Sequence, residues 1–199
     1  MYQKIILASG SPRRRELFSK LRVNFQYVTS EINEEFNTNV PITDEVMRLA
    51  AMKAYNVSNI YNEAMIIGAD TVVVLDGKVF GKPKNRDEAI SMLKQLSGRT
   101  HEVITGVAVI NKKEKICERF YDITKVTFKK ISDELIEWYI DKEEPYDKAG
   151  AYAIQDTGNV LVKSIDGDFY NVVGLPISKI FDTFGKMEFM PYGGLHAIS

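Results

Sequence analysis

Cysteine and histidine are scarce in this chain of 199 residues, and their scarcity limits the chemistry that it can support. Cys117 is the single cysteine, so the chain cannot form an internal disulfide. His101 and His196 are the only histidines, and these three side chains are too few for a zinc site built from thiolates and imidazoles. Any catalytic metal ion would therefore need oxygen ligands.

The sequence also lacks an excess of either charge and any long apolar run. It has 26 basic and 27 acidic residues, so no bulk positive field is available to hold a nucleic-acid backbone. The apolar run 5–8 is too short for a signal peptide, and no later stretch approaches the ~20 apolar residues of a membrane span. We therefore expect a cytoplasmic protein without nucleic-acid or membrane partners.

What is present is ample material for a core, since 45% of the residues are hydrophobic. The length suits one generous domain or two small lobes that share a core. Both hairpin turns and longer connections are predicted, which favours an α/β fold around a mixed sheet with flanking helices. Strands are expected over 4–8, 23–29, 65–75, 79–80, 103–110, 116–128 and 161–165, and helices over 12–21, from 43, over 85–97, from 132 and over 177–184.

The segment between the first strand and the first helix has the features of an anion site. Ser11 is the expected N-cap, and Arg13 and Arg14 fall in the first helical turn, where free N–H groups and the helix dipole already create positive potential. Ser9 and Ser11 add hydroxyls, so the segment suits phosphate oxygens. It is not a Walker loop, and a solvated basic helix end whose arginines pair with surface carboxylates is the alternative.

Asp70 is the only ionisable residue in the apolar run 65–75. A buried carboxylate costs several kcal/mol unless a cation or hydrogen-bond donors meet it, which points to a functional role. It could bind Mg²⁺ or accept a proton from an attacking water, with Thr71 on the opposite face of the strand. The alternative is an aspartate that caps backbone groups at a bulge.

Two lysines and an acidic stretch are ambiguous when each is taken singly. Lys82 lies between Gly81 and Pro83, where glycine would permit an unusual turn and proline would stiffen the backbone after it. Lys53 lies beside the apolar face of a helix and would ordinarily extend to solvent. Glu34 belongs to an acidic stretch that would by itself be a solvated loop.

Several segments in order along the chain resemble the Maf family of nucleotide pyrophosphatases, and the likeness spans nearly all of it. The segments are Ala8-Ser9-Gly10-Ser11-Pro12-Arg13-Arg14, Gly68-Ala69-Asp70-Thr71-Val72, Gly81-Lys82-Pro83, Ser97-Gly98 with Thr105-Gly106, Ala149-Gly150-Ala151-Tyr152 with Ile154-Gln155, and Gly167-Asp168-Phe169-Tyr170-Asn171 with Gly174-Leu175-Pro176.

The resemblance implies one domain over 1–199 with an elongated α/β fold, made of two lobes around a mixed sheet and related to inosine triphosphate pyrophosphatases. Nucleotide would bind in the cleft between the lobes, together with a divalent metal. Mg²⁺ or Mn²⁺ suits carboxylate ligands. The tail 185–199 matches no family motif and has no structure that we predict. A homodimer is left open.

Matching the family's motifs also assigns roles to residues. Asp70 falls on the proton acceptor and, with Glu34, is expected to hold the metal. The remaining residues associated with catalysis are Lys53 and Lys82. The residues expected to bind the phosphates are Ser9, Ser11 and Arg14. The residues associated with substrate choice are Arg13, Thr71 and Gln155.

Threonine after the aspartate, as at Thr71, resembles the branch that hydrolyses dTTP and UTP to the monophosphate and pyrophosphate. Modified pyrimidine nucleotides are left open as further substrates. The alternative from another class is a nucleotide-binding regulator of cell division or septum formation, because the family name is linked to inhibition of septum formation. Retained carboxylates favour catalysis over that alternative.

Overall fold

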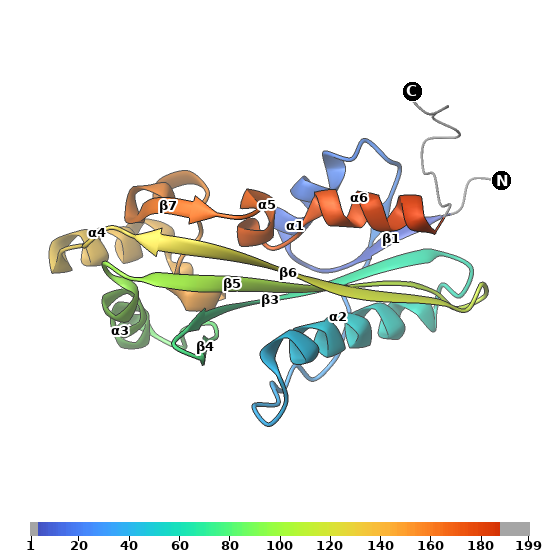
Figure 1. Cartoon of the computed structure of the whole chain (residues 1–199), viewed down its shortest axis with the longest axis horizontal. Coiled ribbons are helices and arrows are strands. Elements are labelled where there is room, and N and C mark those ends of the chain that lie inside the picture. Colours follow the sequence, from blue (N-terminus) through green and yellow to red (C-terminus); the bar gives the residue numbers. More distant parts are fainter. Residues whose placement is uncertain (1–3, 188–199) are drawn as a thin grey trace. The chain divides into compact units, whose positions relative to one another are not determined.

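The structure is a computed structural model, and it describes residues 4–187 (Figure 1). Helices and strands alternate along most of the chain, and three short 3-10 turns follow the fourth helix. The elements are β1 (Ile5–Ala8), α1 (Pro12–Ser19), β2 (Gln26–Tyr27), α2 (Ile42–Ser58), β3 (Met65–Leu75), β4 (Lys78–Phe80), α3 (Arg86–Leu96), β5 (Thr100–Asn111), β6 (Ile116–Phe128), α4 (Asp133–Glu143), η1 (Pro145–Asp147), η2 (Ala149–Ala151), η3 (Asp156–Leu161), β7 (Val162–Asp166), α5 (Phe169–Val173) and α6 (Ile177–Lys186).

The strands form one mixed sheet of seven in the order β2-β1-β3-β5-β6-β7, with β4 paired to β3. Strand β1 is parallel to both β2 and β3, whereas the pairs β3–β4 and β6–β7 are antiparallel. The predicted α/β fold with a mixed sheet and flanking helices is therefore confirmed. Among residues 4–187, no helix is both long and apolar enough to cross a bilayer.

Element boundaries follow local chemistry closely where the apolar pattern is strong. The strands over 65–75 and 116–128 have the predicted bounds. The strand expected over 23–29 is much shorter, because only Gln26 and Tyr27 pair with β1 and both are exposed. Asp76 and Gly77 both have positive φ, as the predicted hairpin turn requires.

The described chain divides into two compact units. Within the described residues, the first unit comprises 4–70, 105–121 and 174–187, and the second comprises 71–104 and 122–173. One domain made of two lobes stays a prediction. The tail expected over 185–199 begins later, since Gly185 and Lys186 belong to α6, and its remainder from 188 lies outside the described residues.

In the first unit, α2 packs directly on the backbone of the sheet, and Figure 1 shows it running alongside β3. A Cβ atom added at Gly106 of β5 would lie 2.4 Å from the carbonyl carbon of Val46, and one added at Gly68 of β3 would lie 2.2 Å from the carbonyl oxygen of Ala50. Only glycine allows such an approach. Small residues around this contact form a buried cluster, including Ala8, Ala50 and Ala54.

The second unit has an aromatic cluster at its core. The rings of His101, Phe128 and Tyr152 meet edge to face, with centroids 4.8–5.4 Å apart. A ring nitrogen of His101 lies 2.7 Å from the Tyr152 hydroxyl. The hydroxyl of Tyr139 accepts a hydrogen bond from the backbone N–H of Ala153 at 3.1 Å. Together these contacts fix the chain leading to η3.

Candidate active site

The segment from β1 to α1 is ordered by its two serines. Ser11 is the N-cap of α1, and its hydroxyl accepts a hydrogen bond from the backbone N–H of Arg14 at 3.4 Å. The hydroxyl of Ser9 accepts one from the backbone N–H of Ser11 at 3.2 Å, and Ser9 is buried. Pro12 occupies the first helical turn, as predicted. The two hydroxyls therefore order the N-terminus of α1, where the sequence predicts a phosphate site.

Arg14 connects this segment to the carboxylates of the same unit. Its Nε donates to the carbonyl oxygen of Gly174 at 2.8 Å. Burial lowers the pKa of the Arg14 guanidinium, and the negative charges of Asp70 and Glu34 oppose that shift. A partly buried guanidinium is stabilised by nearby negative charge, which Asp70 and Glu34 supply and a phosphate would increase. The partial burial of Arg14 and its bond to Gly174 disfavour the alternative of a solvated basic helix end.

The neighbouring Arg15 has a different partner. Its guanidinium carbon lies 4.2 Å from the ring centroid of Tyr27, a cation–π arrangement on β2. Of the three arginines at the start of α1, Arg15 is thus engaged with the sheet edge. Arg13 raises the positive charge beside Arg14, because its charge is among the causes that lower the pKa of Arg14.

Lys53, Asp70 and Glu34 form an ion-pair chain. Lys53 Nζ donates to Asp70 Oδ1 at 2.6 Å and to Glu34 Oε2 at 3.0 Å. Lys53 is only 6% exposed and Asp70 only 8%, whereas the Glu34 side chain is 48% exposed. The alternatives of a lysine extended to solvent and an aspartate that caps backbone are therefore wrong. Strand β3, helix α2 and the acidic loop supply one residue each.

The donor set suits a divalent ion that is only partly held by protein. Within residues 4–187, no group of three or more histidine, cysteine, aspartate or glutamate side chains could form a metal cage. Asp70 and Glu34 each have one oxygen on Lys53 and a second carboxylate oxygen. Mg²⁺ is commonly bound by one or two carboxylates and substrate phosphates, so the two residues fit that kind of site.

The other expected site residues belong to the second unit. Thr71 follows Asp70 directly in β3, Lys82 is exposed, and Gln155 is partly buried just before η3. Gly81 lacks a positive φ, so an unusual turn is not the reason for glycine beside Lys82. Its carbonyl oxygen instead accepts the backbone N–H of Gly150 at 3.0 Å. Roles of these residues at the site of Asp70 stay predictions.

Comparison with known proteins decides the family. Residues 4–187 match the family described as Maf-like protein. The chain belongs to the Maf family. A relative from Thermoanaerobacter sp. (strain X514), named dTTP/UTP pyrophosphatase, is 51% identical over 187 residues, which cover 94% of this chain and 97% of the relative.

Further Maf relatives carry the same name. A dTTP/UTP pyrophosphatase of Bacillus cereus is 47% identical over 178 residues, covering 89% of this chain and 92% of the relative. Among solved structures, the chain is similar to the Staphylococcus aureus Ham1 protein at 12% identity and a TM-score of 0.45, covering 63% of this chain and 72% of that one. The family match, and not this weak similarity, establishes kinship.

Some residues that shape the candidate site of this Maf protein gave little or no signal in the sequence. The carbonyl oxygen of Gly174 orients Arg14, and a backbone acceptor 160 residues away leaves no local pattern. Glu45 and Arg48 are charged residues at helical spacing in α2, and they bind one another and the loop of Glu34. Their spacing of three residues could have suggested the ion pair, but not its contact with the loop.

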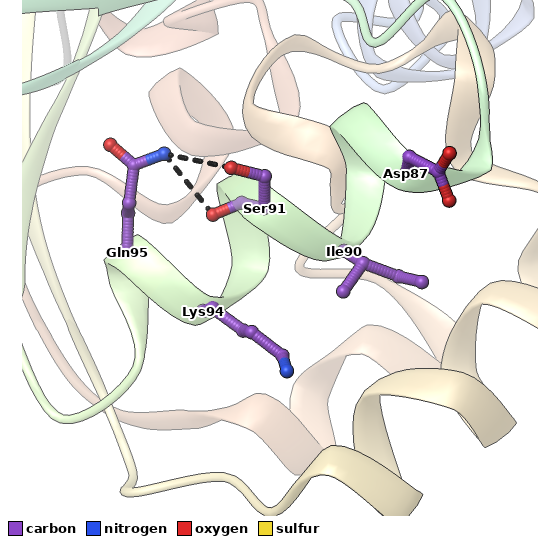
Figure 2. Close-up of a pocket in the computed structure, with 5 residues that line it drawn as sticks. All are labelled: Asp87, Ile90, Ser91, Lys94 and Gln95. Carbon is purple, nitrogen blue, oxygen red and sulfur yellow. Dashed lines mark hydrogen bonds between the residues drawn. The ribbon is translucent and has the colours of Figure 1, made fainter.

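One surface hollow has none of the predicted site residues in its lining. Figure 2 shows that α3 alone supplies the side chains that line it, among them Asp87, Ile90 and Lys94. The side-chain amide of Gln95 donates to the carbonyl oxygen of Ser91 at 3.2 Å within the helix. Substrate sites usually have polar groups that converge from several elements. Because this hollow is lined by one helix, we do not assign it as the substrate site of this Maf protein.

Proposed function

We propose that this protein hydrolyses dTTP and UTP to the monophosphate and pyrophosphate. The observation that carries the proposal is the buried Asp70 carboxylate, held at 2.6 Å by Lys53 in the same unit as the arginine segment. Relatives that share about half of the sequence over nearly its whole length are named dTTP/UTP pyrophosphatase. The site would offer the two parts that this reaction needs, which are cationic groups for the phosphates and a carboxylate base.

The grip would act on the triphosphate. Backbone N–H groups at the start of α1 and the guanidinium groups of Arg13 and Arg14 provide donors for phosphate oxygens, and arginine can bind them in pairs. Lys53 and Lys82 would add positive charge against the leaving pyrophosphate. Phosphoryl chemistry depends mainly on positioning and charge neutralisation, so these side chains would supply much of the rate enhancement.

Asp70 would act on the attacking water. The water oxygen forms a bond to the α-phosphorus, the bond from that phosphorus to the bridging α–β oxygen breaks, and pyrophosphate leaves. Asp70 accepts the proton that the water loses. Lys53 fixes the carboxylate through Oδ1 and thereby limits its rotation, so that the second oxygen can face the reacting atoms.

Asp70 and Glu34 would also hold a divalent ion, Mg²⁺ or Mn²⁺, together with the phosphates. When bound, such an ion supplies charge neutralisation at the phosphate oxygens.

Substrate choice would depend on Arg13, Thr71 and Gln155. The amide of Gln155 can donate and accept at once, which fits the O4 and N3–H edge of thymine or uracil. The side chain of Gln155 is partly exposed and is not used as a cap of η3. The same edge is present in many modified pyrimidines, so these are further candidate substrates.

The decisive experiment measures products from single nucleoside triphosphates. The purified chain is incubated with dTTP, UTP, dCTP, dATP or dGTP in Mg²⁺ or Mn²⁺, and pyrophosphate is distinguished from orthophosphate. We expect pyrophosphate from dTTP and UTP. Asp70→Asn should remove most activity, whereas Asp76→Asn, which breaks an exposed ion pair with Arg99, should keep it.

Two outcomes would count against the proposal. No turnover of dTTP or UTP with either metal would reject it, and tight nucleotide binding without turnover would favour the regulator of cell division instead. Full activity of Asp70→Asn would place the base at another residue.

A further inference from the structure

A second charged cluster lies about two helical turns from Lys53 along α2, and its hydrogen bonds run to a loop. Glu45 in α2 is fully buried, at 0% exposure. Arg48 grips its carboxylate with two donors: Nε to Oε2 at 2.6 Å and Nη2 to Oε1 at 2.6 Å. The hydrogen bond from Arg48 lowers the pKa of Glu45, so the pair stays ionised at neutral pH. Burial of a charged carboxylate is costly even when it is paired, so we expect this ion pair to have a specific role.

The pair reaches out to the loop 31–39, which contains no helix or strand. The backbone N–H of Asn37 donates to Glu45 Oε1 at 2.7 Å. Arg48 Nη2 donates to the carbonyl oxygen of Glu35 at 3.1 Å. The loop backbone is thus bound on both sides of residue 36 by side chains of α2.

Asn56 holds the beginning of the same loop. Its Oδ1 accepts the backbone N–H of Glu31 at 3.2 Å, and its Nδ2 donates to the carbonyl oxygen of Glu31 at 3.4 Å. Positions 45, 48, 52 and 56 follow helical spacing and share one stripe of α2, and Met52 accepts a contact from Arg48 within that stripe. One helix face therefore binds the loop along its length.

Glu34 lies between these attachment points. Its side chain is about half exposed and makes its ion pair with Lys53 at 3.0 Å. One ion pair with a half-exposed partner contributes too little to order a nine-residue loop against its conformational entropy. The backbone contacts of Glu45, Arg48 and Asn56 supply the missing restraint.

We infer that Glu45 and Arg48, with Asn56, are positioning residues that hold the loop 31–39 so that Glu34 reaches Lys53 beside Asp70. The inference rests on the proposed function for its catalytic consequence, but the holding of the loop can be measured without catalysis. The competing explanation is that Glu45 only stabilises α2, because an acidic residue near a helix N-terminus interacts favourably with the helix dipole. In that case the loop would keep its order when the pair is broken.

The test compares Glu45→Gln, Arg48→Met and Arg48→Lys by amide hydrogen exchange and steady-state kinetics. Exchange at the Asn37 amide should rise about tenfold in the first two variants, because its acceptor is weakened or displaced. Arg48→Lys keeps the charge but loses the fork, so it should fall between them and the unmodified chain. Arg48→Lys can still be measured if Arg48→Met, which leaves the buried Glu45 carboxylate unpaired, fails to fold.

The kinetic readout separates positioning from a loss of fold. Under the proposed function, kcat for dTTP should fall by about 10- to 100-fold in Glu45→Gln and Arg48→Met, with KM changed less than about threefold, because the phosphate grip lies elsewhere. Glu63→Gln is the matched control, since Glu63 pairs with Lys113 at an exposed position of the same unit. It should change neither measurement.

Each result bears on the inference. Unchanged exchange at Asn37 in every variant would overturn it, and so would faster exchange with unaltered kcat in an active enzyme. If the unmodified chain releases no pyrophosphate, the proposed function fails; exchange at Asn37 then decides the inference alone, with faster exchange supporting the hold on the loop and unchanged exchange overturning it.

Discussion

A Cβ atom at Gly68 would lie 2.2 Å from the carbonyl oxygen of Ala50, so β3 and α2 meet with no side chain between them. Gly68 and Asp70 are two residues apart on the strand and face the same side of it. Lys53 follows Ala50 by three residues on the helix and faces the same contact. The close approach of the two backbones thus brings Lys53 Nζ within 2.6 Å of Asp70.

Replacing Gly68 by alanine should push α2 from β3 and disturb the Lys53–Asp70 pair. The added methyl group meets backbone atoms of Ala50 and Ala54, which cannot move as a side-chain end would. We expect a loss of about 1–3 kcal/mol in the free energy of unfolding, and a fall in kcat. Urea denaturation and pyrophosphate release provide the measurements.

Gly185→Ala is the control for that substitution. Gly185 lies in α6, and an added Cβ meets nothing within 4 Å among the described residues. Alanine there should be neutral or stabilise by up to about 1 kcal/mol. Equal effects of the two substitutions would contradict the importance of the close contact.

Lys53→Met should destabilise the protein more than the loss of an ordinary ion pair. It leaves the buried Asp70 carboxylate without its ion-pair partner, which costs about 3–5 kcal/mol. The double variant Lys53→Met with Asp70→Asn should recover part of that loss, because residue 70 then carries no charge. Lys113→Met, at an exposed pair with Glu63, should cost less than about 1 kcal/mol. If the effects of Lys53→Met and Asp70→Asn on the free energy of unfolding are additive in urea denaturation, Lys53 and Asp70 are not coupled.

His101 should make the protein less stable in mild acid. Burial lowers the pKa of His101 to about 4, below its usual value of 6.5, so the folded chain binds this proton more weakly than the unfolded chain. Stability is therefore fully present above about pH 6.5 and is lost as the pH falls toward 4. Between pH 7 and 4.5 the loss should be about 2 kcal/mol.

His101→Gln isolates this contribution from that of the carboxylates. The variant cannot bind the proton, so it should lose about 2 kcal/mol less than the unmodified chain over the same pH range. Free energies of unfolding in urea at both pH values give the comparison. Identical pH dependence in the two proteins would show that His101 does not titrate in the unfolding reaction.

Arg13→Ala and Gln155→Ala should alter the preference among nucleotides more than the overall rate. If Gln155 binds the thymine or uracil edge, its loss should lower kcat/KM for dTTP and UTP by about tenfold relative to dCTP. Arg99→Ala, which breaks only an exposed pair with Asp76, is the control. Unchanged ratios of kcat/KM across the nucleotide panel would remove both residues from substrate choice.

Local chemistry in the sequence determined several elements of the structure. The apolar run 65–75, β-branched toward its end, favoured a buried strand, and Ser11-Pro12 could open a helix without help from distant residues. Weak patterns were less informative: the expected strand over 23–29 is reduced to Gln26 and Tyr27, because pairing with β1 decides its length. Asp70 was conspicuous for a physical reason, since its charge interrupts an apolar strand.

The partners of the site residues were decided only by tertiary structure. Lys53 and Glu34 were each ambiguous in the sequence, and they became a site because Gly68 lets α2 reach β3 and because α2 binds the acidic loop. Sequence patterns report burial and local hydrogen bonding, which depend on neighbours along the chain. The partners in the Lys53–Asp70 and Lys53–Glu34 ion pairs are separated by 17 and 19 positions in the sequence. These pairs depend on how helix, strand and loop pack, and no local sequence pattern predicts them.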